Sequence, residues 1–351
     1  MLQYDVLVVG GGPAGSSAAS AAVKAGAKVL LIEKKKIIGE PVRCAEFIPK
    51  LLLHNSQVDH RCIVQEIRGM KIYFPNGEYV QTNAPGFMLD RSRFDKELAG
   101  YAKENGADLL TGTMCVSKRG KRVLLNNNGR QEIVGAQVII GADGPKSTVG
   151  KWIHSINHDF ILGYQYQVPL KESHDCTEIF FDADFVGGYA WLFPKGNVAN
   201  VGIGIRYHHQ LGVSKVAEEL LKKILKRVED EGKIENRILS ATRGVIPVGG
   251  PLPTVKENII LVGDAAGQTH PITGGGIPQA MICGEIAGRV AATAVQEGRN
   301  DRLLDYEKEW KSIFGAELER ARMKRRLLES QWNKLDTIMK QCWVIFREYY
   351  E

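Results

Sequence analysis

The sequence lacks the features that mark several large classes of protein. Its apolar runs stay well short of the ~18 residues that a membrane-spanning helix needs. The six cysteines form no C-x-x-C pair and no dense framework, so we expect free thiols in a reducing compartment. The eight histidines show no spacing typical of metal ligands, so we expect no metal. Internal repeats, low-complexity linkers and nucleic-acid-binding modules are also missing from the sequence.

The composition is that of an ordinary globular protein. Of 351 residues, 44% are hydrophobic and 25% are charged, which favours one large domain or two interleaved domains. The net charge of +6 is spread along the chain, so we expect no nucleic-acid partner, while a basic patch facing phosphates or lipid headgroups fits it. The first residues lead directly into a strand-like segment, so we expect no signal peptide and a cytoplasmic location.

The most informative stretch is residues 6–15, Val-Leu-Val-Val-Gly-Gly-Gly-Pro-Ala-Gly, in which a short apolar run leads into glycines. Gly10 and Gly12 allow a tight turn and a close approach of the backbone to a pyrophosphate. Gly15 allows the following helix to pack tightly on its own strand. The pattern is typical of a strand–turn–helix unit that binds a dinucleotide.

The residues that follow complete this unit. Residues 14–25 are predicted to form a helix whose N-terminal N–H groups attract phosphate. Residues 28–33 are predicted to form the next strand, which ends at Glu33, where an acid accepts hydrogen bonds from a ribose hydroxyl. We interpret the lysines at 34–36 as a solvated loop, because Glu33 disfavours a 2′-phosphate. At this point FAD and NAD(P) both remain open as the ligand.

Two more predicted strands end in glycines far along the chain, at residues 138–144 and 258–267. Between them, apolar and polar residues alternate over residues 160–206, as in the strands of a sheet. This order predicts an α/β protein with a discontinuous, Rossmann-like cofactor domain and a second, antiparallel sheet that binds substrate. The predicted ranges are 1–60, 85–157 and 245–300 for the cofactor domain, 61–84 and 158–244 for the substrate domain, and 301–351 for C-terminal helices.

These motifs together carry a resemblance to known families. Gly10 to Gly15, Asp143-Gly144-x-x-Ser147 and the Gly-Asp-Ala-Ala-Gly of residues 263–267 resemble the FAD-dependent group that includes aromatic hydroxylases and flavin halogenases. Residues 41–46 (Pro-Val-Arg-Cys-Ala-Glu) and 188–196 (Gly-Tyr-Ala-Trp-Leu-Phe-Pro-Lys-Gly) resemble the geranylgeranyl reductases within that group. The resemblance covers about residues 4–300. It implies FAD as cofactor, a ββα-type FAD domain, and saturation of C=C bonds in polyprenyl chains of lipids or isoprenoids by hydride transfer from reduced flavin.

The same resemblance implies which residues bind FAD. At two positions, however, this sequence departs from the pattern of the group. Lys151 stands near where the group often has Arg, and Phe47 stands where it usually has glycine. The implied cofactor residues are Ala14 and Glu33 at the pyrophosphate and ribose, Cys44 and Ala45 beside the isoalloxazine, Arg91 at the phosphates or adenylate end, Cys115 touching the adenine by its backbone, Asp264 at the ribityl–pyrophosphate region, and Gly276 with Ile277 at the flavin ring.

Cys44 is our candidate catalytic residue. Saturating an alkene requires a proton on one carbon as well as a hydride on the other, and a thiol beside the flavin is a suitable acid or acid relay. The alternative is that Cys44 is only a small buried apolar residue. His270 is a weaker candidate for a proton relay.

Tyr189, Trp191 and Phe193 alternate along one strand, so their rings are expected on one face. We interpret them as an aromatic wall that binds the prenyl substrate, with Lys195 and Lys171 placed to meet a phosphate headgroup. Core packing is the alternative interpretation of the three rings.

The C-terminal region carries an apolar stripe at alternating spacings of three and four over residues 328–349, which predicts one continuous helix. A basic cluster precedes it at residues 320–326. Either the stripe packs on the protein's own body or a second subunit, or it lies on a membrane surface with the basic cluster on anionic headgroups. The second alternative predicts a peripheral membrane contact.

Two other functions compete with the prenyl reductase. An FAD-dependent monooxygenase or halogenase of a hydrophobic substrate fits the wider group, although Tyr189 and Phe193 replace two residues of the halogenase Trp-x-Trp-x-Ile-Pro pattern. A flavin-dependent sensor or lipid-binding protein is the non-enzymatic alternative. No second G-x-G-x-x-G motif occurs, so we expect electrons from NAD(P)H entering the substrate cleft or from a ferredoxin-like protein.

Overall fold

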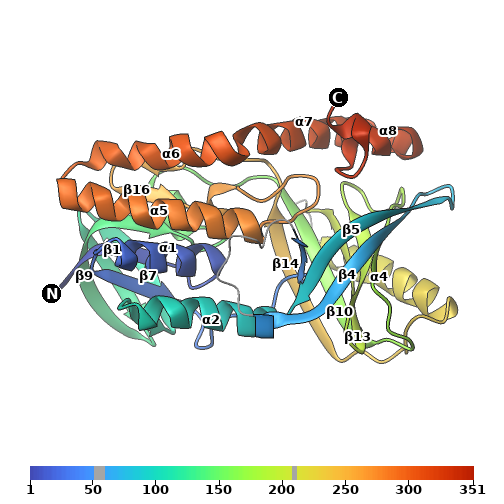
Figure 1. Ribbon diagram of the computed structural model, residues 1–351, viewed down its shortest axis with the longest axis horizontal. Coiled ribbons are helices and arrows are strands. Elements are labelled where there is room, and N and C mark those ends of the chain that lie inside the picture. Colours follow the sequence, from blue (N-terminus) through green and yellow to red (C-terminus); the bar gives the residue numbers. More distant parts are fainter. Residues whose placement is uncertain (51–59, 208–211) are drawn as a thin grey trace.

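The structure, a computed structural model, describes residues 1–50, 60–207 and 212–351. Two sheets lie next to each other along the long axis of the molecule, and the C-terminal helices run along one side of both (Figure 1). Parts of our predicted domain ranges, residues 51–59 and 208–211, lie outside the described residues.

The first sheet has the parallel ladder expected for a dinucleotide-binding unit. Its order is β15-β16-β9-β1-β2-β6, with parallel pairing from β16 to β6, while β7, β8 and the first half of β9 form an antiparallel meander. The strands are β1 (Leu2–Val9), β2 (Val29–Glu33), β6 (Asp108–Thr111), β7 (Thr113–Arg119), β8 (Arg122–Asn127), β9 (Arg130–Gly141), β15 (Val255–Lys256) and β16 (Ile259–Leu261).

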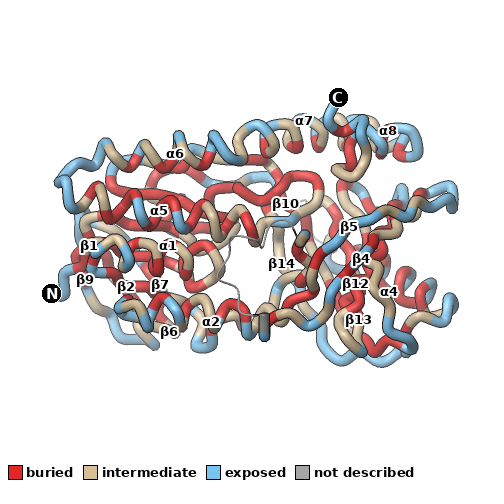
Figure 2. The backbone as a smooth tube through the Cα atoms, in the orientation of Figure 1, coloured by how far each residue is buried: buried red, intermediate tan, exposed pale blue. Residues whose placement is uncertain are grey.

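Helices α1 (Pro13–Lys24) and α5 (Ile277–Glu297) pack against each other beside this sheet (Figure 1). Their backbones approach closely because α5 carries glycine at the contact. A Cβ on Gly284 would lie 2.2 Å from the Ala14 carbonyl oxygen, and one on Gly288 would lie 2.1 Å from that of Ala18. Figure 2 shows that the facing sides of these helices and the strands beside them are buried. Helix α2 (Arg91–Glu104) packs beside α1, and the short α3 (Thr148–Trp152) contacts β9 and β16.

The second sheet is antiparallel except where β11 pairs with β4. Its order is β14-β10-β13-β12-β11-β4-β5-β3, and helix α4 (Val213–Asp230) packs on one of its faces. The strands are β3 (Phe47–Pro49), β4 (Ile63–Tyr73), β5 (Tyr79–Leu89), β10 (Phe160–Pro169), β11 (Cys176–Phe180), β12 (Tyr189–Lys195), β13 (Val198–Arg206) and β14 (Ser240–Pro247). Strand β3 and the ends of β5 and β14 therefore lie in the second sheet, although our ranges assigned these residues to the cofactor domain.

The C-terminal helices cover the other face of the second sheet. Helix α5 is followed by α6 (Leu304–Trp310), one turn of π-helix over residues 311–315, α7 (Ala316–Ser330) and α8 (Leu335–Cys342). Our expectation of one continuous helix over 328–349 is wrong, because α7 ends at Ser330 and α8 ends at Cys342. The apolar stripe is real, but most of its residues pack into a core with β12 and β4: Leu328, Leu335, Ile338, Met339, Cys342 and Tyr349, with Trp332, Ile345 and Phe346 partly buried against it.

Three of the five cations in the basic cluster over residues 320–326 form ion pairs within the protein. Arg320 pairs with Glu317, Arg322 with Glu319, and Arg325 with Glu329. Within the described residues, no helix is long and apolar enough to cross a bilayer. The structure therefore favours packing of the stripe on the protein's own body.

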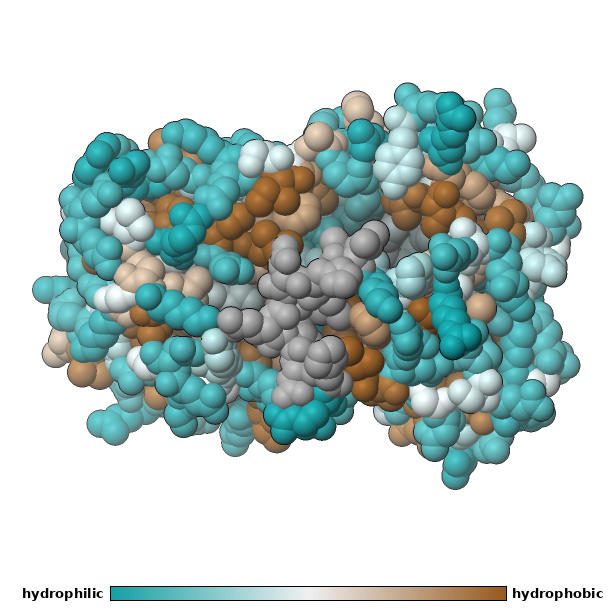
Figure 3. Space-filling model, in the orientation of Figure 1, coloured by the Kyte–Doolittle hydropathy of each residue, from teal (hydrophilic) through white to brown (hydrophobic). Residues whose placement is uncertain are grey.

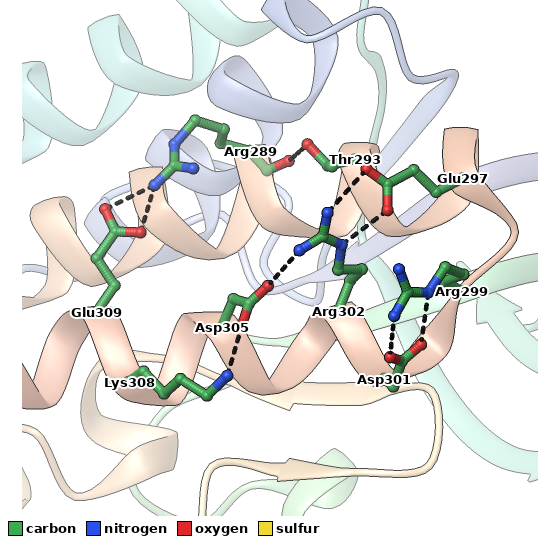
Figure 4. A network of polar contacts seen from close by, with 9 residues as sticks. All are labelled: Arg289, Thr293, Glu297, Arg299, Asp301, Arg302, Asp305, Lys308 and Glu309. Carbon is green, nitrogen blue, oxygen red and sulfur yellow. Dashed lines mark hydrogen bonds and ion pairs between the residues drawn. The ribbon is translucent and has the colours of Figure 1, made fainter.

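Helices α5 and α6 also face each other across a network of surface ion pairs (Figure 4). Exposed pairs of this kind contribute about 0–1 kcal/mol each. The buried apolar contacts of α5 and α6 therefore hold them together far more than these charges do. The pairs are Arg289–Glu309, Arg302–Glu297, Arg302–Asp305, Lys308–Asp305 and Arg299–Asp301.

Candidate flavin and substrate site

The glycine turn after β1 forms a cradle that is closed on one side and open on the other. Gly10 has φ +111°, and a Cβ there would lie 2.2 Å from the Ala142 carbonyl oxygen. A Cβ on Gly15 would lie 1.8 Å from the Gly10 carbonyl oxygen, so the helix packs directly on its strand. Gly12, the N-cap of α1, has nothing within 4 Å of its Cβ position among the described residues. The open space at a helix N-terminus suits a phosphate group.

Glu33 is fixed beside this cradle at the end of β2. Its Oε2 accepts a hydrogen bond from the Gly11 N–H at 2.8 Å, and its Oε1 accepts one from the Lys35 N–H at 2.9 Å. Both contacts orient the carboxylate and leave each oxygen a second lone pair for a ribose hydroxyl. Lys34 and Lys36 are exposed as expected, whereas Lys35 is half-buried, which lowers the pKa of its ammonium group. We did not predict the roles of Gly11 and Lys35, although Gly11 lies inside the glycine motif.

Cys115 lies in β7, in the apolar cluster that also contains Val9 and Ile32. Burial, together with the nearby Asp143 carboxylate, raises the pKa of the Cys115 thiol to about 12. Asp143 accepts hydrogen bonds from the Thr148 and Val149 N–H groups and so caps α3. The backbone of Cys115 at the adenine end of FAD stays a prediction.

Asp264 lies where α5 begins. Its Oδ1 accepts a hydrogen bond from the Thr269 hydroxyl at 2.7 Å, and a Cβ on Gly276 would lie 3.6 Å from the same oxygen. Gly276 is the N-cap of α5 and Ile277 its first residue. Burial raises the pKa of the Asp264 carboxyl, and the Arg91 guanidinium partly opposes this shift. The structure thus brings Asp264, Gly276 and Ile277 together, as their proposed roles at one ligand require.

Arg91 lies beside Cys44. Its guanidinium also contacts Cys44 and forms a bidentate pair with Asp95 at 3.0 and 3.1 Å; burial lowers the pKa of Arg91, but the Asp95 carboxylate outweighs this and raises it. We expected Arg91 at the phosphates or the adenylate end. The structure places it next to Cys44 and within electrostatic reach of Asp264, and its place along FAD stays a prediction.

The Cys44 loop is bonded to the second sheet through its carbonyl groups. The carbonyl of Val42 accepts from the Thr242 hydroxyl at 2.7 Å, that of Cys44 from Gln165 Nε2 at 3.2 Å, and that of Ala45 from Asn200 Nδ2 at 3.2 Å. The donors come from β14, β10 and β13, so three strands hold one loop. Sequence reasoning missed all three donors, because they lie 121 to 200 residues from their partners.

Glu46 ends this loop as a buried carboxylate in the left-handed region, with φ +70°. It accepts hydrogen bonds from Lys195 Nζ at 2.8 Å, Asn200 Nδ2 at 2.9 Å and the Arg91 N–H at 3.0 Å. A non-glycine residue keeps such a conformation only where its surroundings fix it. Our prediction that Lys195 meets a phosphate headgroup is therefore wrong, because its ammonium group is mostly buried against Glu46. Lys171 is exposed, and nothing in the structure assigns it to a site.

Tyr189, Trp191 and Phe193 share one face of β12, as predicted. Their neighbouring ring centroids lie 6.0 and 6.4 Å apart, and the Trp191 indole N–H donates to Gln165 Oε1 at 3.0 Å. Tyr189 and Trp191 line a narrow slit that reaches Gly274, whereas Phe193 packs against Phe47. The rings thus contribute to core packing, and two of the three also line an opening beside the α5 N-terminus.

His270 lies in the loop before α5 but faces the C-terminal segment. Its Nδ1 accepts from the Ile272 and Thr273 N–H groups, and its Nε2 lies 3.2 Å from Glu317 Oε1 and 3.3 Å from the Tyr349 hydroxyl. These contacts fasten the end of the chain to this loop. The weaker expectation of a proton relay at His270 gains no support from them.

Three family descriptions match different parts of the chain. Residues 5–144 match "FAD dependent oxidoreductase", residues 159–246 match "Geranylgeranyl reductase catalytic domain", and residues 212–350 match "Lycopene cyclase protein". The second match covers β10 to β14 almost completely and includes the aromatic strand β12.

Relatives that align over most of the chain carry names that agree with the second of these matches. A digeranylgeranylglycerophospholipid reductase of Methanococcus vannielii is 37% identical over 326 residues, which cover 88% of this chain and 82% of that protein. The enzyme of the same name from Methanocaldococcus jannaschii is 35% identical over the same length and shares of coverage. The crystal structure of a geranylgeranyl bacteriochlorophyll reductase-like protein from Thermoplasma acidophilum superposes with a TM-score of 0.86 at 31% identity, covering 99% of this chain and 92% of that one. A flavin-dependent brominase superposes with a TM-score of 0.74 at 18% identity, covering 97% and 90%, and so shares the fold alone.

Proposed function

The chain belongs to the geranylgeranyl reductase family, and from that premise we propose that it is an FAD-dependent reductase that saturates C=C bonds in the geranylgeranyl chains of a glycerophospholipid. The observation that carries the proposal is the bonding of the Cys44 loop to the sheet that bears Trp191. Through it, the cofactor side and the prenyl side of the site form one unit. The alternative of a monooxygenase or halogenase rests only on distant neighbours that share the fold.

The residues of this chain fit FAD. The open space at Gly12 suits the pyrophosphate, and a fixed Glu33 carboxylate lies beside it for the ribose. Asp264, Gly276 and Ile277 meet at the N-terminus of α5, where backbone N–H groups favour an electron-rich ring edge. When bound, the reduced flavin supplies the two electrons and one of the two hydrogens that a C=C bond takes up.

Cys44 supplies the other hydrogen in this proposal. Burial raises the pKa of its thiol, so the thiol stays protonated at neutral pH and can donate. When the proton leaves, the Arg91 guanidinium and the Glu46 N–H, 3.2 Å from Sγ, stabilise the negative charge on sulfur. Tyr189 and Trp191 exclude water from the alkene.

The test is a single-turnover assay. The protein is loaded with FAD, reduced without oxygen, and mixed with a digeranylgeranylglycerophospholipid in detergent micelles. We expect the flavin absorbance to return to its oxidised form while mass spectrometry shows a gain of two hydrogens per saturated bond. Lipid binding without any turnover would indicate a sensor or lipid-binding protein, and an oxygen-dependent hydroxylated or halogenated product would indicate the alternative enzyme.

Two further proposals concern the electron donor and a contact with the membrane surface. We propose NAD(P)H or a ferredoxin-like protein as donor, and steady-state reduction of bound FAD by each decides between them. A peripheral membrane contact fits a water-insoluble substrate, but most of the C-terminal stripe, one of whose two interpretations was such a contact, is buried. On the face shown in Figure 3, apolar patches gather near the junction of the two sheets. Sedimentation with anionic vesicles tests this contact.

A further inference from the structure

A polar cavity of about 160 Å³ opens where β10, the end of β13 and helix α7 meet. It has the volume of a few water molecules or of one phosphate group. Two guanidinium groups, Arg206 and Arg325, line it together with His158 and Tyr207, and the carboxylates of Asp159 and Glu329 complete the lining. None of these residues has a role in the flavin site.

The two arginines differ in how firmly they are held. Arg325 is buried, and it donates to the Pro271 and Gly187 carbonyl oxygens at 3.0 Å each and pairs with Glu329 at 2.8 Å. Arg206 is 39% exposed, and its guanidinium is held on one side by Glu329 at 3.0 Å. Arg325 is thus part of the framework, whereas Arg206 presents its remaining N–H groups to the cavity, as a bidentate phosphate contact requires.

This cavity lies next to the slit beside the proposed flavin site. Both are lined by Val248 and Arg325, and the lining of the slit extends past Ile246 and Trp191 to Gly274. About 30 Å³ of the slit is open, so an aliphatic chain would have to displace side chains such as Ile246 to enter it.

Gly187 leaves the junction between cavity and slit without a side chain. Gly187 has φ +74°, and a Cβ there would lie 3.1 Å from the Arg206 Cβ and 3.4 Å from Arg325 Nη2. A side chain at this position would therefore press on both arginines at the point where cavity and slit meet.

We propose that this cavity binds the phosphate group of the prenyl lipid through Arg206, with the buried Arg325 as a fixed positive charge behind it, while the lipid's chain passes through the slit toward the flavin. The proposal rests on the proposed function and adds to it the place of the headgroup. It replaces our sequence prediction of Lys195 for that role. Asp159 and Glu329 balance the two arginines, so a phosphate is held firmly only when the attached chain also occupies the slit.

The experiment compares two substrates in the single-turnover assay: the prenylated glycerophospholipid and the matching prenyl alcohol, which has no phosphate. Arg206→Gln is expected to raise the half-saturating concentration of the phospholipid about 10- to 100-fold, the range for the loss of a charge-assisted hydrogen bond. It should leave the prenyl alcohol unaffected. Asp159→Asn removes an opposing charge and is expected to lower the half-saturating concentration of the phospholipid. A purely structural role of the cavity does not produce these opposite effects.

Arg289→Gln is the matched control, because Arg289 is 52% exposed and pairs with one glutamate, Glu309, far from the cavity (Figure 4). Equal saturation of wild type and Arg206→Gln by the phospholipid would overturn the proposal while leaving the reductase function intact. Competition by inorganic phosphate as effective as that by the phospholipid would assign the cavity to free phosphate and would also overturn it. If wild type reduces neither substrate, the proposed function itself fails.

Discussion

Gln165 joins the aromatic strand β12 to the Cys44 loop, and replacing it by Met measures how much that link contributes to stability and turnover. Gln165 is buried in β10, accepts from the Trp191 indole N–H at 3.0 Å and donates to the Cys44 carbonyl at 3.2 Å. Met has a similar length and no hydrogen-bonding group of comparable strength. Gln165→Met therefore leaves one buried donor and one buried acceptor without partners.

Each unsatisfied buried group costs about 1–3 kcal/mol, so we expect Gln165→Met, which leaves two of them, to lower the free energy of unfolding by about 2–6 kcal/mol. Chemical denaturation followed by far-UV circular dichroism measures this directly. Because the Cys44 carbonyl loses its tether, we also expect single-turnover reduction to slow more than lipid binding weakens. FAD occupancy should change little, since the glycine cradle lies outside this link.

Gln167→Met is the control, two residues along the same strand and on the same face. Gln167 is half-buried, and its one side-chain contact, to Asn200 Oδ1, is long at 3.4 Å. We expect a change within about 0.5 kcal/mol. If the two variants unfold at the same denaturant concentration and turn over at the same rate, the link between the aromatic strand and the Cys44 loop contributes nothing, and our reasoning is refuted.

Three further predictions concern the cradle, the thiol and the C-terminal core. Gly12→Val should fold normally but lose FAD, because the added side chain fills the open phosphate space, whereas Gly15→Val collides with backbone and should not fold; flavin content and circular dichroism separate the two. Cys44→Ala should slow single-turnover reduction about 100- to 10,000-fold. Because burial raises the thiol pKa above its ordinary 9.0, the donating form exists below the raised pKa, so the wild-type rate should fall only at higher pH; a rate that falls between pH 6 and 8 would contradict this. Met339→Ala, at a fully buried position, should lower the free energy of unfolding by about 2–5 kcal/mol. Met323→Ala, at a position that is 56% exposed, should leave it almost unchanged. Equal melting temperatures of the two variants would show that α8 does not stabilise this core.

The sequence predicted those parts of the fold whose cause is local. The glycine turn, α1 and β2 follow each other within about thirty residues, so spacing alone identified the cradle and Glu33. Alternation correctly placed Tyr189, Trp191 and Phe193 on one face, because the side-chain period of a strand is fixed.

What the sequence did not reveal depends on contacts between distant segments. The stripe over 328–349 was visible as a pattern, but a pattern does not say what covers it, and the breaks after Ser330 and Cys342 carry no glycine or proline signal. The donors to the Cys44 loop are single polar residues in strands far along the chain. Lys195 shows the same difficulty: its charge suggested a phosphate partner, and the fold supplied Glu46 instead.

The placement of these polar residues explains why the site needs the second sheet as a scaffold. A loop such as 42–46 has carbonyl groups that must be satisfied when it is buried, and its own neighbours in sequence do not supply the donors. Three strands supply them instead, and Glu46 adds an ion pair with a fourth strand through Lys195. Strands β12 and β13, which carry residues that line the slit, are among those strands. If Cys44 is the proton donor and β12 the substrate wall, as we propose, this bonding keeps their spacing fixed, which is the condition for delivering the proton to one carbon of the alkene and not to its neighbours.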